Sequence, residues 1–423
     1  MVIKEDLLHY LWRIKNFDHT NLTTTEGQSL IINNYGTYNH SDGPDFLEAQ
    51  IQYNGVVWNG SIEIHVKSSD WHIHGHATDP NFNNTILHVV YESSKEVTRE
   101  NGEKIPCLEL KNRINTSIIS LYRRFDNLNW VPCESFIQDI PDMVVFWAKE
   151  RAISDRLHRR WKDLQSSEKL NLNTWEETAY RLLCRSFGLV HNAEAFGEIA
   201  SKVPFSLLKK NQDNIEVLEA IYMGVAGLLN VDFKDEYPQK LKGHYSHYKK
   251  KYDLREINIP LRHKAVRPFN FPEIALSQFI NLMRLPQIFS RLIEADLKTL
   301  KELLKVRATS YWNTHFIFDK DSKFKVKLLG SSKIDIVIIN AIVPILYFLS
   351  IKTGNESWSK KAMTLLEQMP AEKNTVINKW TDLNVKSKSA YDSQALLELK
   401  KQYCDSKKCL LCPIGHHIMK SKN

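Results

Sequence analysis

An Asn-Gly pair at residues 54–55, set between two strand-like runs, is the strongest constraint that this sequence places on its fold. The run FLEAQIQY precedes it, VVWNGSIEIHVK follows it, and a second Asn-Gly at 59–60 interrupts the following run. Asn-Gly between alternating apolar residues is the strongest local signal for a β-hairpin, because both residues tolerate the positive φ of a tight turn. SLIINNYG and TILHVVYES add a strand on either side. The region from residue 29 to residue 93 therefore predicts a small mixed sheet.

The sequence on either side of this region has the spacing of helices. Residues 4–17 carry apolar side chains on one helical face, and nearly every segment after about residue 141 is helical in pattern. The change of texture marks a domain boundary within residues 112–140, and 423 residues exceed what one core usually organises. We expect an α+β protein: residues 1–125 form a small mixed-sheet domain, and residues 126–423 form a larger all-α domain that ends in a cysteine-rich tail.

Charge and apolar content indicate the compartment of the protein and the kind of partner that it can bind. Charges lie within the first five residues, so the opening is not a signal peptide, and no apolar run is long and charge-free enough to cross a bilayer. The most apolar stretch, residues 336–351, fits a buried helix. We expect a cytoplasmic protein that makes no membrane contact. Lys and Arg exceed Asp and Glu by 57 − 49 = 8, and residues 240–267 interleave basic and aromatic side chains, which suits DNA or RNA as well as a solvated helix face.

Polar side chains alternate along the strand that follows the predicted hairpin turn. Glu63, His65 and Lys67 share one face because a strand has a period of two, and Ile62, Ile64 and Val66 share the other. Gly43-Pro44 cannot continue a ladder, so Asp45 lies at the mouth of the opposite hairpin arm, facing Glu63. Two carboxylates on one site are costly without a cation, and oxygen ligands suit Mg²⁺ or Mn²⁺. This pattern predicts metal-assisted hydrolysis of a phosphodiester.

The order of elements and these carboxylates resemble the PD-(D/E)XK nuclease fold. The resemblance implies that Pro44-Asp45 is the Pro-Asp element, that Glu63 is the second carboxylate, and that Glu5 supplies an extra acid from the first helix. The sequence departs from the pattern at His65, where the family has lysine. Lys67, two residues later on the same face, is the candidate to replace it.

A second resemblance spans nearly the whole chain. GPDF at 43–46, SIEIHVKSSDWHIHGH at 61–76, ILHVVY at 86–91, RPFNFP at 267–272 and the cysteine tail are similar to an uncharacterised bacterial domain-of-unknown-function family, number 2851. This resemblance implies an identity and no activity.

Histidines crowd the same region and support a competing interpretation. His65, His72, His74, His76 and His88, together with Asp70 and Asp79, place seven possible ligands in 24 residues, and neutral imidazole favours Zn²⁺, Mn²⁺ or Fe²⁺. For each histidine taken alone, hydrogen bonds to local backbone are the better explanation, as capping of a turn is for Asp70. For the N-terminal site we expect Asp45, Glu63, His65 and His88 as ligands. Three hypotheses stay open: a metal-dependent nuclease, an inactive nuclease-like nucleic-acid-binding or scaffold protein, and a zinc-type hydrolase that uses the histidines.

The last feature is the tail CDSKKCLLC, followed by two histidines. Cys404, Cys409 and Cys412 can wrap one metal, either Zn²⁺ or an iron–sulfur cluster. The fourth ligand is His416 or His417 locally, or the distant Cys133. Some PD-(D/E)XK nucleases hold an iron–sulfur cluster with one upstream and three downstream cysteines, and that resemblance implies Cys133 and a tail that folds back onto the first domain.

Overall fold

The computed structural model describes residues 3–39, 41–126, 129–166, 175–264 and 266–421. The chain forms two compact units, which we call unit 1 (Met1–Lys149 with Glu398–Asn423) and unit 2 (Glu150–Leu397). The division falls within one long helix and so does not coincide with the boundary at 125/126 expected from sequence. The cysteine-rich tail belongs to unit 1 and not to the helical unit.

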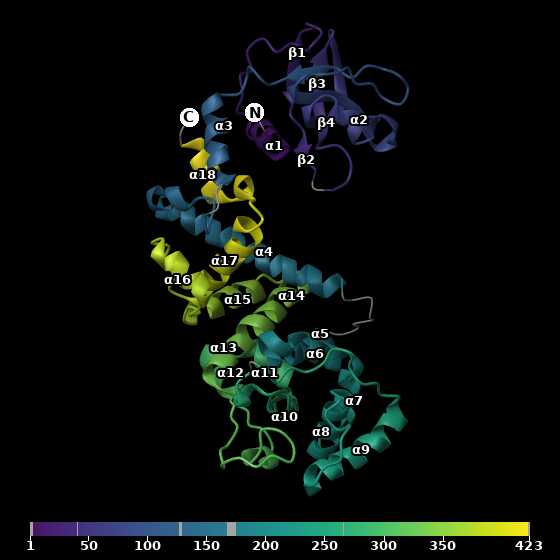
Figure 1. The fold of residues 1–423 in the computed structure, drawn as a ribbon, viewed down its shortest axis with the longest axis vertical. Coiled ribbons are helices and arrows are strands. Elements are labelled where there is room, and N and C mark those ends of the chain that lie inside the picture. Colours follow the sequence, from purple (N-terminus) through teal and green to yellow (C-terminus); the bar gives the residue numbers. More distant parts are fainter. Residues whose placement is uncertain (1–2, 40, 127–128, 167–174, 265, 422–423) are drawn as a thin grey trace. The chain divides into compact units, whose positions relative to one another are not determined.

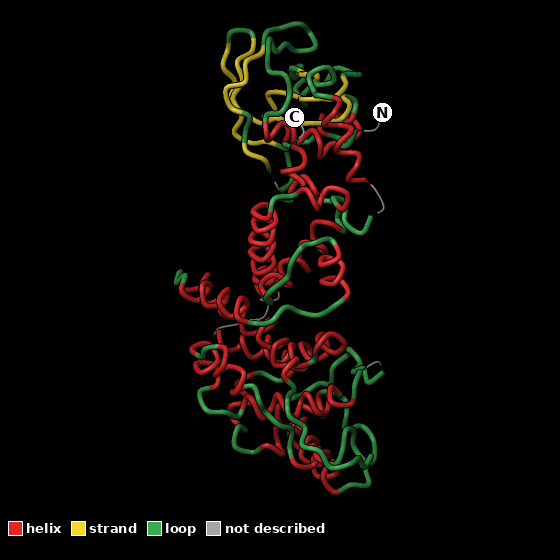
Figure 2. The backbone as a smooth tube through the Cα atoms, turned by 90° about the vertical axis from the view of Figure 1, so that its left-hand side faces the viewer, coloured by secondary structure: helices red, strands yellow, loops and turns green. Residues whose placement is uncertain are grey.

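Unit 1 holds a six-stranded mixed sheet, and Figure 2 shows strands only in this part of the described chain. The strand order is β1-β3-β4-β5-β6, with β2 paired to β3. The prediction of a small mixed sheet followed by a mostly helical region is confirmed (Figure 1). The elements of unit 1, with α4 shared between the units, are α1 (Glu5–Ile14), β1 (Leu30–Asn34), β2 (Thr37–Tyr38), β3 (Phe46–Tyr53), β4 (Val56–Lys67), α2 (Asp70–Ile73), β5 (Thr85–Glu92), β6 (Cys107–Glu109), α3 (Thr116–Arg123), α4 (Asp142–Ser166) and α18 (Pro413–Lys420).

The β3–β4 hairpin turns at the first Asn-Gly pair. Asn54 and Gly55 have φ of 51° and 75°, and Tyr53 pairs with Val56, so the hairpin prediction is confirmed there. The second Asn-Gly does not interrupt the run. It lies inside β4, which continues through it. Gly60 serves a different purpose: a Cβ at this position would lie 2.4 Å from the carbonyl oxygen of Asn84. The glycine lets the segment before β5 approach the strand.

The sheet changes direction between β4 and β5. β3 and β4 are antiparallel, whereas β4, β5 and β6 run parallel, in a register that pairs Glu63 with His88. The connection from β4 to β5 holds α2 and two short 3₁₀ turns, His76–Thr78 and Pro80–Phe82. Trp71 and Phe82 from this connection pack with Val97 and Ile105 into a small buried cluster. The crossover therefore places residues 70–82 against the sheet.

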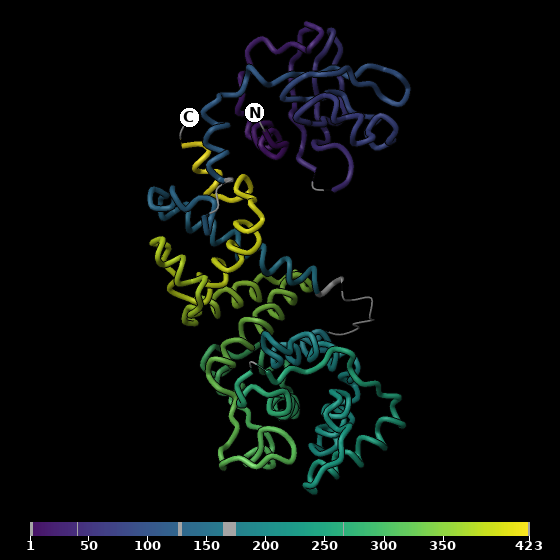
Figure 3. The backbone as a smooth tube through the Cα atoms, viewed as in Figure 1, coloured from purple at the N-terminus to yellow at the C-terminus, as the bar shows by residue number. Residues whose placement is uncertain are grey.

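Helix α1 packs on β4 through fully buried side chains that include Leu7, Leu8 and Trp12. The chain then returns to unit 1 at its end. A π-helical turn at Leu399–Cys404, a 3₁₀ turn at Cys409–Leu411 and α18 follow one another, and these last two contact α1 and α3 respectively. Figure 3 shows this C-terminal segment in yellow beside the blue residues that follow the sheet.

Among its described residues, unit 2 consists of helices joined by loops. Its helices are α5 (Trp175–Phe187), α6 (Leu189–Lys202), α7 (Phe205–Lys210), α8 (Ile215–Val225), α9 (Glu236–Tyr252), α10 (Pro272–Met283), α11 (Ile288–Glu294), α12 (Leu297–Leu303), α13 (Ser331–Val337), α14 (Val343–Thr353), α15 (Ser357–Gln368), α16 (Thr375–Asp382) and α17 (Ala390–Glu398). One stretch, Ser331–Thr353, is long and apolar enough to cross a membrane, and 67% of its most apolar window is buried inside the protein. That burial matches the buried helix expected at residues 336–351.

Candidate metal centre

Asp45 and Glu63 meet across the β3–β4 hairpin, as the sequence predicts. The backbone N–H of Asp45 donates to Glu63 Oε2 at 3.1 Å, and the N–H of Ile64 donates to Asp45 Oδ2 at 2.9 Å. Phe46 pairs with Ile62, so each carboxylate lies one residue beyond a paired position. The two side chains are therefore fixed by the backbone of the opposite strand.

Helix α1 adds a histidine that sequence reasoning missed. His9 Nε2 lies 3.1 Å from Asp45 Oδ2 and 3.9 Å from Glu5 Oε1. Burial works against the charged imidazole, but the closeness of Asp45 outweighs it and raises the pKa of His9. Glu5 thus joins the site through His9. The i, i+4 spacing of Glu5 and His9 on one helix was the signal available in the sequence.

Three imidazoles converge beside the carboxylates. His65 Nε2 lies 3.1 Å from His74 Nδ1, and one ligand atom from each of His65, His74 and His76 lies within 4.8 Å of the others. Glu63 Oε1 lies 3.3 Å from His76 Nε2 and 3.5 Å from His65 Nε2. Gly75, with φ of 77°, makes the turn between His74 and His76. His74 and His76, for which the sequence analysis preferred local hydrogen bonding when each was taken alone, thus converge with His65 beside Glu63.

His88 lies behind this group. Its Nε2 is 2.8 Å from Nδ1 of His65, and its own Nδ1 is buried without a hydrogen-bond partner among the described residues. With the proton on His65 Nδ1, the bond to His88 leaves His65 Nε2 unprotonated and facing His74. His88 therefore contacts the far side of the His65 ring, and it does not lie among the converging donor atoms, where the sequence analysis expected it.

Burial decides the protonation of this site. Burial, and then the negative charge of Asp45, raise the pKa of Glu63 to about 9. Burial, and then neighbouring imidazoles, lower the pKa of His65 to about 2 and that of His88 to about 3. His65 and His88 are therefore neutral near pH 7, which is the form that binds metals. A cation would restore the charge of Glu63, because it favours the ionised carboxylate.

The remaining predicted residues lie outside this group. Lys67 is exposed at the end of β4, and its N–H donates to Asp70 Oδ2, so Asp70 caps a turn as one expectation had it. His72 Nε2 lies 3.3 Å from the carbonyl oxygen of Glu96. Asp79 accepts the N–H of Asn81 at the start of a 3₁₀ turn. Of the seven possible ligands, His65, His74 and His76 therefore converge and His88 contacts His65. The other three, Asp70, His72 and Asp79, bond to backbone groups.

A profile of the family described as "Protein of unknown function (DUF2851)" matches residues 5–375. The chain belongs to this family. No curated protein and no solved structure matches the chain. The matched range of the DUF2851 family contains Glu5, Asp45, Glu63 and the histidines, and it ends before Cys404.

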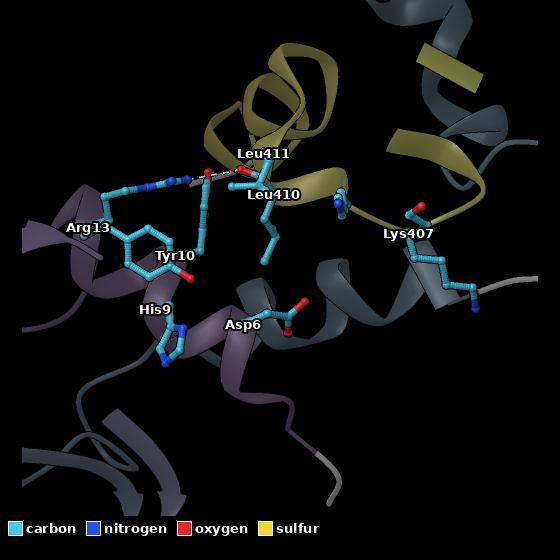
Figure 4. A pocket seen from close by; sticks show the side chains of 10 residues that line it. Asp6, His9, Tyr10, Arg13, Lys407, Leu410 and Leu411 are labelled. Atoms are coloured by element: carbon cyan, nitrogen blue, oxygen red, sulfur yellow. Dashed lines mark hydrogen bonds between the residues drawn. The ribbon is translucent and has the colours of Figure 1, made fainter. Parts of the chain in front are cut away.

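A pocket lies beside His9, between α1 and the C-terminal tail (Figure 4). Its volume is about 160 Å³, which accommodates a small group rather than a whole nucleotide. Arg13 donates to the carbonyl oxygen of Leu410, which joins the two walls. The lining includes three basic side chains and one acidic one: Arg13, Lys407, Lys408 and Asp6. The pocket thus presents an excess of positive charge next to the carboxylate–histidine site.

Proposed function

We propose that this protein is a divalent-metal-dependent hydrolase that cleaves phosphodiester bonds in nucleic acid. The spacing of three imidazole nitrogens, with a Glu63 oxygen beside two of them, carries the proposal. A tetrahedral ion with metal–ligand bonds of about 2.0–2.1 Å holds its donors roughly 3.3 Å apart. Three separations in the site, from Glu63 to His65, from Glu63 to His76 and from His65 to His74, are 3.5, 3.3 and 3.1 Å.

The donor set favours a transition-type ion. Three imidazole nitrogens and one carboxylate oxygen suit Zn²⁺ or Mn²⁺ better than Mg²⁺, which prefers oxygen and water. His65 is buried, His76 is half-buried and His74 is exposed, so the centre opens toward solvent on the His74 side. We therefore propose that His65, His74 and His76 hold the metal, with Glu63 beside His65 and His76. Mg²⁺ or Mn²⁺ between Asp45 and Glu63 is the second arrangement that the proposal allows.

The element order supports a nuclease over other hydrolases. A first helix, a hairpin that carries Asp45 and Glu63 on its two arms, and a following parallel strand agree with the resemblance to PD-(D/E)XK nucleases. His65 stands where those nucleases have lysine. In this proposal His65 serves the metal, and the proton-donating role passes to His9.

The pocket supports a phosphate-bearing substrate. Arg13, Lys407 and Lys408 offer charge and donors for phosphate oxygens, and the chain carries a net charge of +8. His9 lines this pocket and also lies against Asp45. A phosphate held there would lie next to the carboxylates. The six cysteines, all within the described residues, form no disulfide, which suits a reducing compartment, and we place the activity in the cytosol.

Each residue has a chemical task in this proposal. A bound divalent ion supplies a water of lowered pKa and offsets negative charge on the scissile phosphate. Asp45 holds the imidazole of His9 in place and raises its pKa, which favours the charged form of His9. His9 can then donate a proton to the departing oxygen.

The test is cleavage of single-stranded and plasmid DNA and of RNA by the full chain, with Zn²⁺, Mn²⁺ or Mg²⁺ added after chelation. Glu63→Gln and Asp45→Asn should each lower the rate at least about 100-fold, because each removes a charged group from the site. Asp42→Asn is the matched control, since Asp42 is exposed three residues before Asp45. Equal rates in all three variants would refute the proposal. Hydrolysis confined to small esters would remove nucleic acid as the substrate.

A further inference from the structure

The C-terminal segment is held against unit 1 by specific contacts. The hydroxyl of Tyr10 on α1 lies 3.0 Å from His416 Nδ1 on α18, and Arg13 bonds to the carbonyl oxygen of Leu410. Ile414, Ile418 and Met419 of α18 are buried. The tail is thus a structural part of the unit that carries the candidate metal centre.

Four cysteines gather where the tail meets residues 131–139. Cys133 precedes a 3₁₀ helix, Cys404 ends the π-helical turn, Cys409 begins the next 3₁₀ turn and Cys412 precedes α18. Cys133, Cys409 and Cys412 are buried and Cys404 is half-buried. Cys404 lies within electrostatic reach of the other three, and Cys133 lies within reach of Cys409 and Cys412. None of the four forms a disulfide.

The backbone of the tail is shaped to bring these thiols together. A Cβ on Gly415 would lie 2.0 Å from the carbonyl oxygen of Cys409, so only glycine lets α18 approach the preceding turn this closely. Lys407, between Cys404 and Cys409, takes a left-handed φ of 51° to reverse the chain. Together, the close approach at Gly415 and the chain reversal at Lys407 fold residues 404–415 into a compact segment.

The other two cysteines differ in their surroundings. Cys107 lies on β6, where its thiol interacts with Ser93, Glu109 and Thr25, and Cys184 donates to the carbonyl oxygen of Phe196 in unit 2. Each fits ordinary core packing. The chain therefore offers a grouped set of four thiols together with an ungrouped thiol in the same unit.

We propose that Cys133, Cys404, Cys409 and Cys412 bind one thiophilic metal centre, a zinc ion or an iron–sulfur cluster, as a tetrathiolate site. Four thiols are the ligand set that both centres take, and both centres require deprotonated sulfur, so binding releases the thiol protons to solvent. This inference does not rest on the proposed hydrolase activity.

The site also fixes a part of the pocket. Lys407 and Lys408 line the pocket beside His9, and they lie in the short loop between the ligands Cys404 and Cys409. A metal centre that anchors both ends of this loop holds the two lysines in place. The tetrathiolate site is thus a structural support for the basic wall of the pocket.

The experiment is metal and sulfide analysis of the full chain purified without oxygen, in a His74→Ala/His76→Ala background that removes the other centre. We expect one zinc ion per chain without visible colour, or iron with inorganic sulfide and a brown absorption. Cys409→Ser and Cys133→Ser should each lose that metal, whereas Cys107→Ser should keep it. Metal content that is the same in Cys409→Ser and Cys107→Ser would overturn the proposal.

A second measurement tests the proposal without the serine variants, in case these variants fail to fold. The background protein, stripped of metal and given Co²⁺, should develop the strong near-ultraviolet bands of cobalt–thiolate bonds. A folded protein that takes up no metal and shows no such bands would overturn the proposal as well.

Discussion

Glu63 is the residue in which the two halves of the candidate site meet. Its Oε2 accepts the N–H of Asp45, and its Oε1 faces His65 and His76. One buried carboxylate is therefore shared between the hairpin and the histidine cluster. A substitution at Glu63 therefore affects both the contact with Asp45 and the histidine cluster. A substitution at His74 or His76 affects only the histidine cluster.

The bond between His65 and His88 gives a prediction for metal affinity. His88→Phe keeps the ring volume but leaves His65 Nδ1 without its partner, so nothing fixes the orientation of the ligand. Loss of such an orienting bond lowers metal affinity about 10–100-fold. We expect this loss in a calorimetric titration with Zn²⁺, while the stoichiometry stays at that of the native protein. His72→Ala, which removes a histidine bonded to backbone, should leave the affinity unchanged.

The raised pKa of Glu63 gives a prediction for the metal-free protein. The folded state keeps the proton up to about pH 9, whereas the unfolded chain loses it near its ordinary value of 4.5. Unfolding therefore releases a proton between these values, and the Glu63 contribution to stability, complete below pH 4.5, is lost as the pH rises toward 9. The slope is at most about 1.4 kcal/mol per pH unit.

Urea unfolding of the chelated protein at several pH values measures this slope. Glu63→Gln removes the titrating group, so its stability should fall less steeply than that of the native chain above neutral pH. The lowered pKa values of His65 and His88 act in the opposite direction, because the unfolded chain binds their protons below about pH 6.5. Both proteins share that loss in acid. Parallel pH profiles for the two proteins would contradict the assignment to Glu63.

At the scale of the element, the β3–β4 hairpin shows what a local pattern can and cannot predict. Asn54-Gly55 and the period of two were enough to bring Asp45 beside Glu63 and to put His65 on the same face. The same dipeptide at Asn59-Gly60 does not form a hairpin turn, because Gly60 lies within the strand and leaves room for the carbonyl oxygen of Asn84. Composition alone does not distinguish a turn glycine from a packing glycine.

The contribution of His9 could not be predicted from the strands. His9 reaches Asp45 only because α1 packs on β4, a contact between residues far apart in the sequence. His74 and His76 likewise join His65 only after the crossover connection folds back. Sequence patterns identified the residues of one hairpin, and tertiary packing supplied the others.

Two helical glycines of unit 2 predict stability changes of opposite sign when each is replaced by alanine. A Cβ on Gly224 in α8 would lie 2.2 Å from the ring of Tyr245 in α9, whereas a Cβ on Gly243 in α9 meets nothing within 4 Å. Gly224→Ala should destabilise the protein by about 1–3 kcal/mol through overpacking. Gly243→Ala should stabilise it by up to about 1 kcal/mol, because alanine favours the helix. Denaturant unfolding of both variants tests this pair, and a loss at both positions would contradict the open space at Gly243.

At the scale of the whole molecule, the chain leaves unit 1 at residue 149 and returns to it at residue 398. The helical pattern of residues 126–423 gave no sign of this return, because helix periodicity reports which face is buried and not what buries it. The cysteines were the one feature that linked residue 133 with residues 404–412. Long-range organisation was thus predictable only where side-chain chemistry pointed to it.

This organisation predicts the effect of removing the tail. A chain that ends at Leu397 loses α18 and the buried side chains of Leu399, Ile414, Ile418 and Met419 from unit 1. Each fully buried aliphatic side chain contributes about 1.5–3 kcal/mol, so the loss to unit 1 should exceed about 5 kcal/mol. Unit 2 keeps its own core and should unfold at its original temperature. Calorimetry of the full chain should therefore resolve two transitions, of which truncation lowers or abolishes one. A truncated chain in which both transitions move equally would show that the tail stabilises the two units alike, which contradicts its place in unit 1.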